Sequence, residues 1–214
     1  MELDIVARAA KVAKRVQQVS AYVMKTLSDV DAPQGVIAFC RKPCWDWSAL
    51  AARLPAPILI LDGIQDPGNL ATIVRTAEAA GAAGVVTTPG TAHLFSPKAL
   101  RGAMGSSLRL PILEHLPAGQ IAAKVKTLGY RILGATLPQK SGGDKVYTEV
   151  DWAKPQAVVL GQEAKGISAD WLSLIDQAIY LPMRPSVESL NVGAAAAVIL
   201  YESVRQRGGC LPSA

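Results

Sequence analysis

Hydrophobic residues in the central part of the chain form short continuous runs separated by stretches with helical spacing. Residues 58–62 are almost entirely apolar, which is typical of a strand buried on both faces. Apolar residues then recur at helical spacing from Leu70 to Ala77, until Gly81 ends the pattern. Residues 84–88 predict the next strand, so this stretch is a strand-helix-strand unit.

The same alternation continues toward the end of the chain. Ser96 and Pro97 predict a helix start, because proline is favoured at the first helical position. The further predicted elements are a helix at 121–128, a strand at 131–135, a polar loop at 140–151, a strand at 157–160, a short helix at 171–175, a strand at 178–181 and a closing helix from 189 to about 205. Such alternation implies an α/β fold with a parallel sheet covered by helices on both faces.

The first part of the chain has weaker patterns. Apolar spacing predicts a helix over residues 3–27, whose basic side either is solvated or contacts RNA phosphates. Residues 35–40 predict a short strand, and residues 41–57, with three prolines, predict a linker. We therefore expect a partial N-terminal region at 1–57 and a main domain at 58–214.

The composition fits one domain of ordinary size and part of a second. Half of the 214 residues are hydrophobic, and the net charge of +5 favours polyanionic partners. The three cysteines, Cys40, Cys44 and Cys210, are too scattered for a four-ligand zinc site or a disulfide framework. No secretory signal or membrane-spanning run is evident, so we expect a cytoplasmic protein without a membrane partner.

Two of the late predicted strands end in turns: 157–160 ends in the glycine-containing turn 161–166, and 178–181 ends at a proline with a helix opening beyond it at 189–191. The turn at 66–69 lies between the first buried strand and its helix. Because the carboxyl ends of parallel strands meet at one edge of a sheet, these turns predict a ligand crevice there. Asn69 either only caps the helix that follows it or serves the ligand at that edge. Arg75 is either a solvated side chain or a partner for a phosphate or carboxylate at that edge.

Other kinds of site are not predicted. No glycine-rich dinucleotide fingerprint follows the first strand, and no P-loop motif occurs. We expect His93 and His115 to lie far apart, with neither beside a plausible serine or cysteine nucleophile. No group of histidines and carboxylates has the spacing of metal ligands, so we expect no metal site.

Taken in order, three motifs resemble the SpoU/TrmH class of the SPOUT superfamily. They are residues 66–81, 160–166 and 181–192, within a resemblance that covers about residues 58–207. Members of this class are S-adenosylmethionine-dependent RNA ribose 2'-O-methyltransferases. The resemblance implies a parallel-sheet SPOUT domain with a C-terminal trefoil knot and a homodimer, whereas the apolar pattern alone predicts an unknotted doubly wound sheet.

The resemblance also implies which residues form the site. The residues expected to hold S-adenosylmethionine, largely through backbone atoms, are Gly161, Leu181 and Leu190. The expected polar catalytic set is Asn69, Arg75, Glu163, Ser189 and Asn191. Because the pKa of arginine exceeds 12, we expect Arg75 to clamp a phosphate instead of acting as the base.

The chain departs from the family pattern in three places. Residues 1–57 resemble the end of a small ribosomal-protein-like RNA-binding domain, with 32–38 as its last strand, so either the chain starts internally or RNA recognition is reduced. Ala71 replaces a usual glycine, which would crowd the site if the methyl group is not accommodated. Arg184 and Pro185 replace a glycine-rich stretch before Ser189, which would stiffen that loop.

The expected partner is RNA, with ribosomal RNA favoured over transfer RNA. The alternative from another class is a non-catalytic RNA-binding module on the same knotted scaffold. The presence of all five polar motif residues argues against that alternative. A small-molecule methyltransferase is a third option, disfavoured by the basic front helix.

Overall fold

The computed structural model describes residues 2–30, 32–138, 143–163 and 165–209, so residues 140–142 of the predicted polar loop lie outside the described part. The chain divides into two compact units, Met1–Lys42 and Pro43–Ala214. This division falls earlier than the expected boundary at residue 57. Residues 43–57 belong to the second unit because Leu50 and Ala56 are buried in its core.

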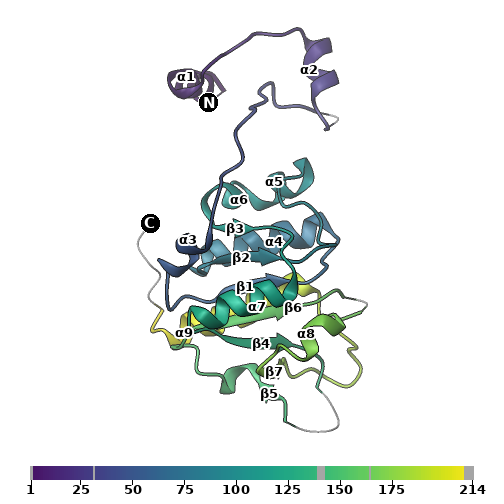
Figure 1. The fold of residues 1–214 in the computed structure, drawn as a ribbon. Helices are drawn as coiled ribbons and strands as arrows, with labels where there is room; N and C mark the ends of the chain where they lie inside the picture. Colours follow the sequence, from purple (N-terminus) through teal and green to yellow (C-terminus); the bar gives the residue numbers. More distant parts are fainter. Residues whose placement is uncertain (1, 31, 139–142, 164, 210–214) are drawn as a thin grey trace. The chain divides into compact units, whose positions relative to one another are not determined.

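The second unit is built on a seven-stranded sheet in the order β3-β2-β1-β6-β4-β7-β5, and every pair of neighbouring strands is parallel (Figure 1). The strands are β1 Ile58–Leu61, β2 Gly84–Thr87, β3 Ile112–Leu113, β4 Arg131–Ala135, β5 Lys145–Val146, β6 Gln156–Leu160 and β7 Gln177–Tyr180. The predicted parallel α/β sheet is therefore confirmed, and all its strands end at one edge.

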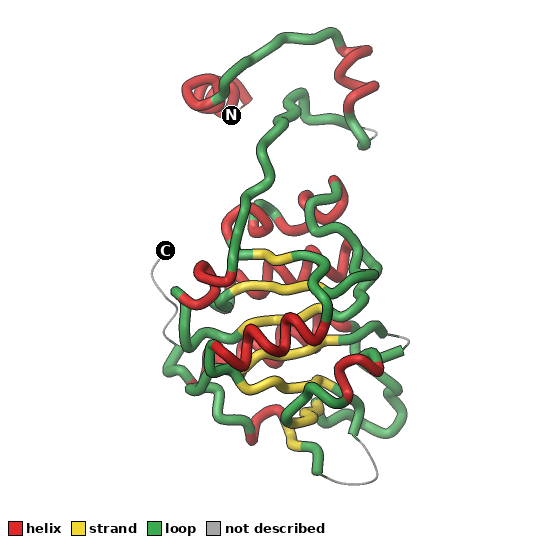
Figure 2. The backbone as a smooth tube through the Cα atoms, viewed as in Figure 1, coloured by secondary structure: helices red, strands yellow, loops and turns green. Residues whose placement is uncertain are grey.

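Helices connect the strands and cover the sheet (Figure 2). They are α3 Trp47–Ala51, α4 Pro67–Ala79, α5 Pro97–Ala103, α6 Ser106–Arg109, α7 Ala118–Thr127, the 3-10 turn Tyr147–Glu149, α8 Ala169–Leu172 and α9 Val192–Gln206. The short elements β3 and α6 were not expected, because runs of two and four residues are too short to show a hydrophobic period. The same reason applies to β5 and the 3-10 turn, which form within the stretch 140–151 that was predicted to be a loop.

The core has two sides because successive strand residues point to opposite faces of the sheet. Leu59 and Leu61 pack in a cluster with apolar residues of α4 and α9. Ile58 and Ile60 pack on the other face with Leu50 of α3, together with residues of α7 and α8. Burial on both faces explains why these strands have continuous apolar runs.

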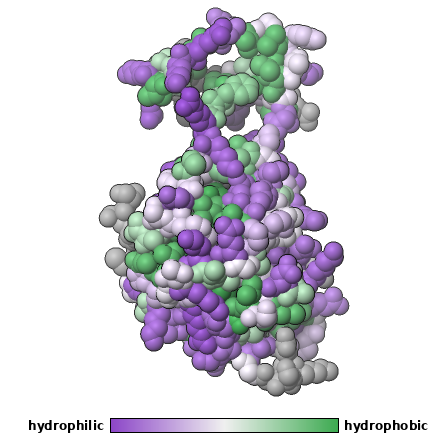
Figure 3. All heavy atoms as spheres, in the orientation of Figure 1, coloured by the Kyte–Doolittle hydropathy of each residue, from purple (hydrophilic) through white to green (hydrophobic). Residues whose placement is uncertain are grey.

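The first unit differs from the sequence prediction. The expected helix over 3–27 is two helices, α1 Glu2–Val12 and α2 Ala21–Leu27, because Ser20 accepts a hydrogen bond from the Val23 amide and starts the second helix. The expected strand at 35–40 does not form, since no strand of this unit pairs with it among the described residues. Apolar side chains are exposed on this unit (Figure 3). Val12 and Phe39 are the most exposed of those described.

The expected linker at 41–57 contains helix α3. Asp46 caps it by accepting hydrogen bonds from the amides of Ser48 and Ala49. The helix places Leu50 against the sheet, so this segment is part of the domain. Within the described ranges, no helix has both the length and the apolar character required to cross a membrane.

An ion pair joins α4 to α6 and has a pH-dependent effect on stability. Arg109 donates to both carboxylate oxygens of Glu78, with Nε–Oε1 at 2.6 Å and Nη2–Oε2 at 2.8 Å. These hydrogen bonds lower the pKa of Glu78 from its ordinary value of 4.5. The stabilisation is therefore complete above that value and is lost as the pH falls through the lowered folded-state pKa.

We expect Glu78→Gln to lower the free energy of unfolding at pH 7 by at most about 1 kcal/mol, because water screens this partly exposed pair. Urea denaturation of both proteins at pH 7 and in acid measures the effect. The difference should vanish in acid, where Glu78 of the parent protein is protonated. A difference of the same size at both pH values would contradict the assigned role of the ion pair.

Candidate active site

The start of α4 is capped by Asp66, one turn before Asn69. Asp66 Oδ1 accepts a hydrogen bond from the Asn69 amide at 2.8 Å, and Pro67 occupies the first helical position. The interpretation that Asn69 only caps this helix is therefore wrong. Since Asp66 satisfies the exposed amide, the Asn69 side chain is available for other contacts.

Asn69 joins two loops that are distant in the sequence. Its Nδ2 donates a short hydrogen bond to Glu163 Oε1, in the loop after β6. Its Oδ1 accepts a hydrogen bond from Asn191 Nδ2 at 2.9 Å, at the start of α9. The structure thus brings together three of the five predicted polar residues in one hydrogen-bonded chain.

Asn191 also determines where the closing helix begins. Its Oδ1 accepts hydrogen bonds from the amides of Gly193 at 2.9 Å and Ala194 at 3.3 Å. Helix α9 therefore starts at Val192, and the expected start at residue 189 is wrong because Ser189 and Leu190 precede the cap. This leaves both residues in the loop that enters the site.

The loop after β6 folds back tightly on the strand end. Gln162 and Gly166 exchange backbone hydrogen bonds of 3.0 and 2.8 Å. A β-carbon on Gly161 would lie 2.2 Å from the Gly166 carbonyl carbon and 2.3 Å from the Ile167 amide nitrogen. Only glycine permits this close approach of two backbone segments.

A cavity of about 440 Å³ opens beside this loop, at the carboxyl ends of β4 and β6 and beyond β7. Its lining includes five predicted residues, Gly161, Glu163, Leu181, Ser189 and Leu190. The volume lies within the usual range for small-molecule and cofactor sites. The crevice predicted at the sheet edge is therefore present.

The cavity combines an apolar surface with one polar group that has no partner in the described part of the chain. Leu160, Leu181 and Val192 contribute apolar side chains. Thr136, at the end of β4, also lines the cavity, and its buried hydroxyl has no hydrogen-bond partner within the described part of the chain. Such a surface suits a ligand with a flat apolar group and a few polar atoms.

Arg75 lies apart from this cavity. It is exposed on α4, about 9 Å along the helix axis from Asn69 by the rise of 1.5 Å per residue. In the part of the chain with described placement, its guanidinium makes no hydrogen bond or ion pair. Its five donors therefore face solvent and are available to an external anion.

The methyl group of Ala71 does not crowd the cavity. Ala71 is buried between α4 and α5, where a β-carbon on Gly102 would lie 2.7 Å from its own β-carbon. Gly102 thus leaves the space that the alanine occupies. The departure at residue 71 affects helix packing and not the site.

One positioning residue was not predicted. Asp62, directly after β1, is buried, and its carboxylate accepts hydrogen bonds from Thr88 Oγ1 at 2.8 Å and from the Ser168 amide at 2.7 Å. It therefore joins the segments that follow β1, β2 and β6. The sequence signal is a charged residue that ends an otherwise apolar strand, since a buried charge requires partners.

His93 and His115 are adjacent in space, contrary to the sequence prediction. His93 Nδ1 and His115 Nε2 are 3.3 Å apart. The two residues follow β2 and β3, which are parallel neighbours, so both loops leave the same edge of the sheet. Distance along the sequence was misleading because the β2–β3 crossover returns the chain to this edge.

Comparisons of the sequence with known proteins point to one family. The model of the SpoU rRNA Methylase family matches residues 56–201. The chain is 38% identical over 190 residues to an uncharacterized tRNA/rRNA methyltransferase of Synechocystis sp., covering 88% of this chain and 67% of the relative. It is 35% identical over 176 residues to the 23S rRNA (guanosine(2553)-2'-O)-methyltransferase RlmP of Bacillus subtilis, covering 82% and 66%.

Solved structures show the same fold. The SpoU methyltransferase AviRb from Streptomyces viridochromogenes, in complex with AdoMet, matches with a TM-score of 0.71 at 30% identity, covering 78% of this chain and 67% of that chain. An AdoMet-bound rRNA methyltransferase from Sinorhizobium meliloti matches with a TM-score of 0.77 at 25% identity, covering 95% and 77%. The chain spans about two thirds of the length of the curated relatives described above. With the family model matching most of the domain, the chain belongs to the SpoU rRNA methylase family.

Proposed function

We propose that this protein transfers a methyl group from S-adenosylmethionine to the 2'-hydroxyl of a ribose in RNA. The observation that carries the proposal is the cavity at the ends of β4 and β6 beside the hydrogen-bonded residues Asn69, Glu163 and Asn191. Family membership and the AdoMet complexes of related structures support it. Ribosomal RNA is the favoured substrate, because the relatives from Bacillus subtilis and Streptomyces viridochromogenes are named 23S rRNA methyltransferases.

The cavity fits the methyl donor. Backbone groups of Gly161, Leu181 and Leu190 would hold it, with apolar side chains against the adenine and the unpaired Thr136 hydroxyl near its polar atoms. When bound, the donor supplies a methyl group activated by a sulfonium. The protein would position the ribose hydroxyl in line with that methyl group and let its proton pass to the phosphate bound by Arg75, with S-adenosylhomocysteine as the leaving group.

The polar residues divide this work. Arg75 would bind an RNA phosphate with its planar fork and so orient the neighbouring 2'-hydroxyl. Glu163 orients Asn69, while Asn191 ties Asn69 to the start of α9. Ser189, which lines the cavity, would donate a hydrogen bond to the substrate or to the donor.

The same proposal includes a trefoil knot and a homodimer. The knot rests on family membership, and the loop after β6 and the segment between β7 and α9, which would form it, line the same cavity. Val198 and Tyr201 are exposed on α9, and these apolar and aromatic side chains support a dimer surface on the outer side of that helix. Sedimentation of the full chain measures the subunit number, and a monomer at micromolar concentration would contradict this part.

The N-terminal unit would assist RNA binding. Lys11, Lys14, Arg15 and Lys25 are exposed on it and suit a phosphate backbone. A cytoplasmic location is part of the same proposal. Removing residues 1–42 should therefore weaken RNA binding and reduce its dependence on salt concentration.

Transfer of tritium from methyl-labelled S-adenosylmethionine to RNA tests the activity. Label should enter the ribose of ribosomal RNA from cells that lack the gene, and not RNA from cells that contain it. Entry into transfer RNA alone would change the substrate but keep the reaction. No incorporation into either RNA by a protein that binds the donor would favour the non-catalytic RNA-binding alternative.

Substitutions at the start of α4 separate catalysis from helix capping. Asn69→Ala should reduce methyl transfer about 10- to 100-fold, corresponding to the loss of a hydrogen bond to a charged group, with little change in stability. Asp66→Ala should lower the free energy of unfolding by about 1 kcal/mol through loss of the cap. Rate assays and urea denaturation of both variants measure this. A stability loss in Asn69→Ala as large as that in Asp66→Ala would contradict the assignment.

A further inference from the structure

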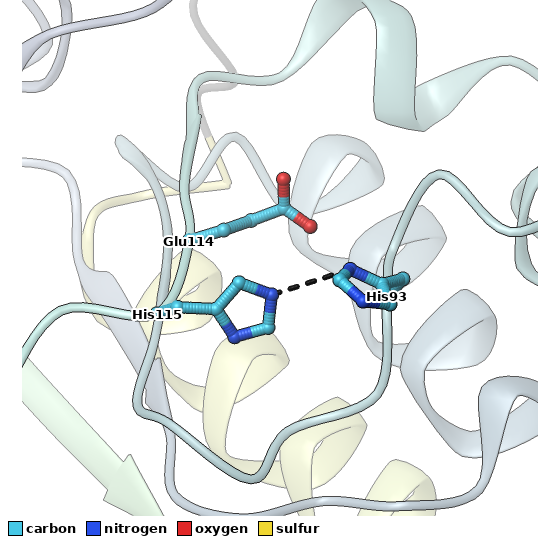
Figure 4. Close-up of side chains that lie close together, drawn as sticks. All are labelled: His93, Glu114 and His115. Atoms are coloured by element: carbon cyan, nitrogen blue, oxygen red, sulfur yellow. Dashed lines mark hydrogen bonds between the residues drawn. The ribbon is translucent and has the colours of Figure 1, made fainter.

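The chain contains two histidines in all, and they meet outside the donor cavity. His93 lies in the loop between β2 and α5, while Glu114 and His115 directly follow β3. Figure 4 shows the three side chains extending toward one another from these two loops. One ligand atom from each residue lies within 4.8 Å of the other two.

The distance between the two imidazoles matches that between two ligands of one metal ion. Zinc binds histidine nitrogens at about 2.0–2.1 Å, and a tetrahedral angle then places two such nitrogens about 3.3 Å apart. The observed separation of His93 Nδ1 and His115 Nε2 is 3.3 Å. The ring planes are 78° apart and the centroids are 5.0 Å apart, so the two rings do not stack in parallel. A hydrogen bond between two neutral imidazoles would give a similar distance, so zinc titration must distinguish the two interpretations.

The backbone holds two of the three ligands in place. His115 has a φ of 57°, in the left-handed region that few residues other than glycine adopt. Its amide donates to the hydroxyl of buried Thr87 at 3.0 Å, at the end of β2. Glu114 Oε1 accepts a hydrogen bond from the Leu94 amide at 3.4 Å, next to His93. A strained residue fixed by a buried strand end is a feature of functional sites.

We propose that His93, Glu114 and His115 bind one divalent transition-metal ion, with zinc as the best match. Two neutral imidazoles and a carboxylate are a common zinc ligand set, and they leave a fourth position for water. His93 is exposed, so an ion can enter from solvent. The site requires no part of the methyl-transfer proposal.

The ion would act as a clamp between two loops. It joins the loop that leads into α5 to the end of β3, and α5 packs on α4. Helix α4 carries Asn69 and Arg75, so the clamp would support the helix that presents the polar residues. Binding to the folded state alone also stabilises the protein against unfolding.

Zinc titration of the full chain tests the proposal. The sample for this titration is the untagged protein from which a chelator has removed all metal. It carries the substitutions Cys40→Ser, Cys44→Ser and Cys210→Ser, which remove competing thiol ligands. Because the chain has only two histidines, proton NMR resolves each imidazole without ambiguity. We expect both imidazole signals to shift with one equivalent of zinc, calorimetry to give one site, and the melting temperature to rise.

Substitutions identify the ligands. His93→Gln and Glu114→Gln should each weaken zinc binding more than about 10-fold, since even the partners of metal ligands contribute that much. Asp170→Asn, an exposed carboxylate on α8, should bind zinc as the parent does. His93 is exposed, so His93→Gln should fold even if His115→Ala does not. Imidazole signals unchanged at a large excess of zinc, or equal affinity in His93→Gln, would overturn the proposal.

Discussion

Arg75→Ala is expected to lower methyl transfer by about 100-fold or more while leaving S-adenosylmethionine binding unchanged, because loss of orientation alone costs rates of this size. Arg75 is exposed and lies outside the lining of the donor cavity. Its loss would therefore remove a contact with RNA and not one with the donor. Single-turnover rates with saturating RNA, together with calorimetry of donor binding, measure the two effects separately.

Two further variants sharpen this experiment. Arg75→Lys keeps the charge but loses the planar fork, so it should restore only part of the rate. Lys124→Ala removes an exposed cation from α7, on the other face of the sheet, and should leave the rate unchanged. Lost donor binding in Arg75→Ala would contradict the phosphate-clamp assignment.

Gly161→Ala is expected to abolish donor binding and to destabilise the domain. The added methyl group would lie 2.2 Å from backbone atoms of Gly166, and backbone atoms yield less readily than a flexible side chain. We expect a loss of about 3 kcal/mol in the free energy of unfolding, at the upper end of the usual cost of overpacking. Urea denaturation and calorimetry with S-adenosylmethionine provide the measurements.

Gly119→Ala is the matched control. Gly119 lies in the first turn of α7, where an added β-carbon meets no atom within 4 Å. Alanine in a helix should leave donor binding unchanged and stabilise the protein by about 0.4–1 kcal/mol. Normal donor binding by Gly161→Ala would contradict the proposal that the backbone at Gly161 holds the donor.

The sequence was sufficient where a pattern extended over many residues. The apolar runs at 58–62 and 157–160 predicted buried parallel strands, because a strand covered on both faces needs apolar residues at every position. The sequence was not sufficient where an element forms only by pairing with a strand from elsewhere in the chain. Residues 35–40 have strand character, yet no neighbouring strand pairs with them in the described part of their unit.

For the site, too, the sequence predicted some features and the tertiary structure decided others. The resemblance of the three motifs to the family predicted five residues that line the cavity. These motifs are short and local, so they can be found in the sequence without knowledge of the fold. Which side chains meet was decided by tertiary structure. The bond between Asn69 and Asn191 spans 122 positions of the chain, and it depends on Asp66 capping α4 in place of Asn69.

The sequence by itself thus determined the α/β class, the order of most elements and the family to which the chain is similar. Only the tertiary structure decided the contacts between loops at the sheet edge. His93, Glu114 and His115 meet because β2 and β3 are parallel neighbours whose loops leave the same edge. Hydrophobic periodicity reports which face of an element is buried, whereas strand order and register determine which loops become neighbours.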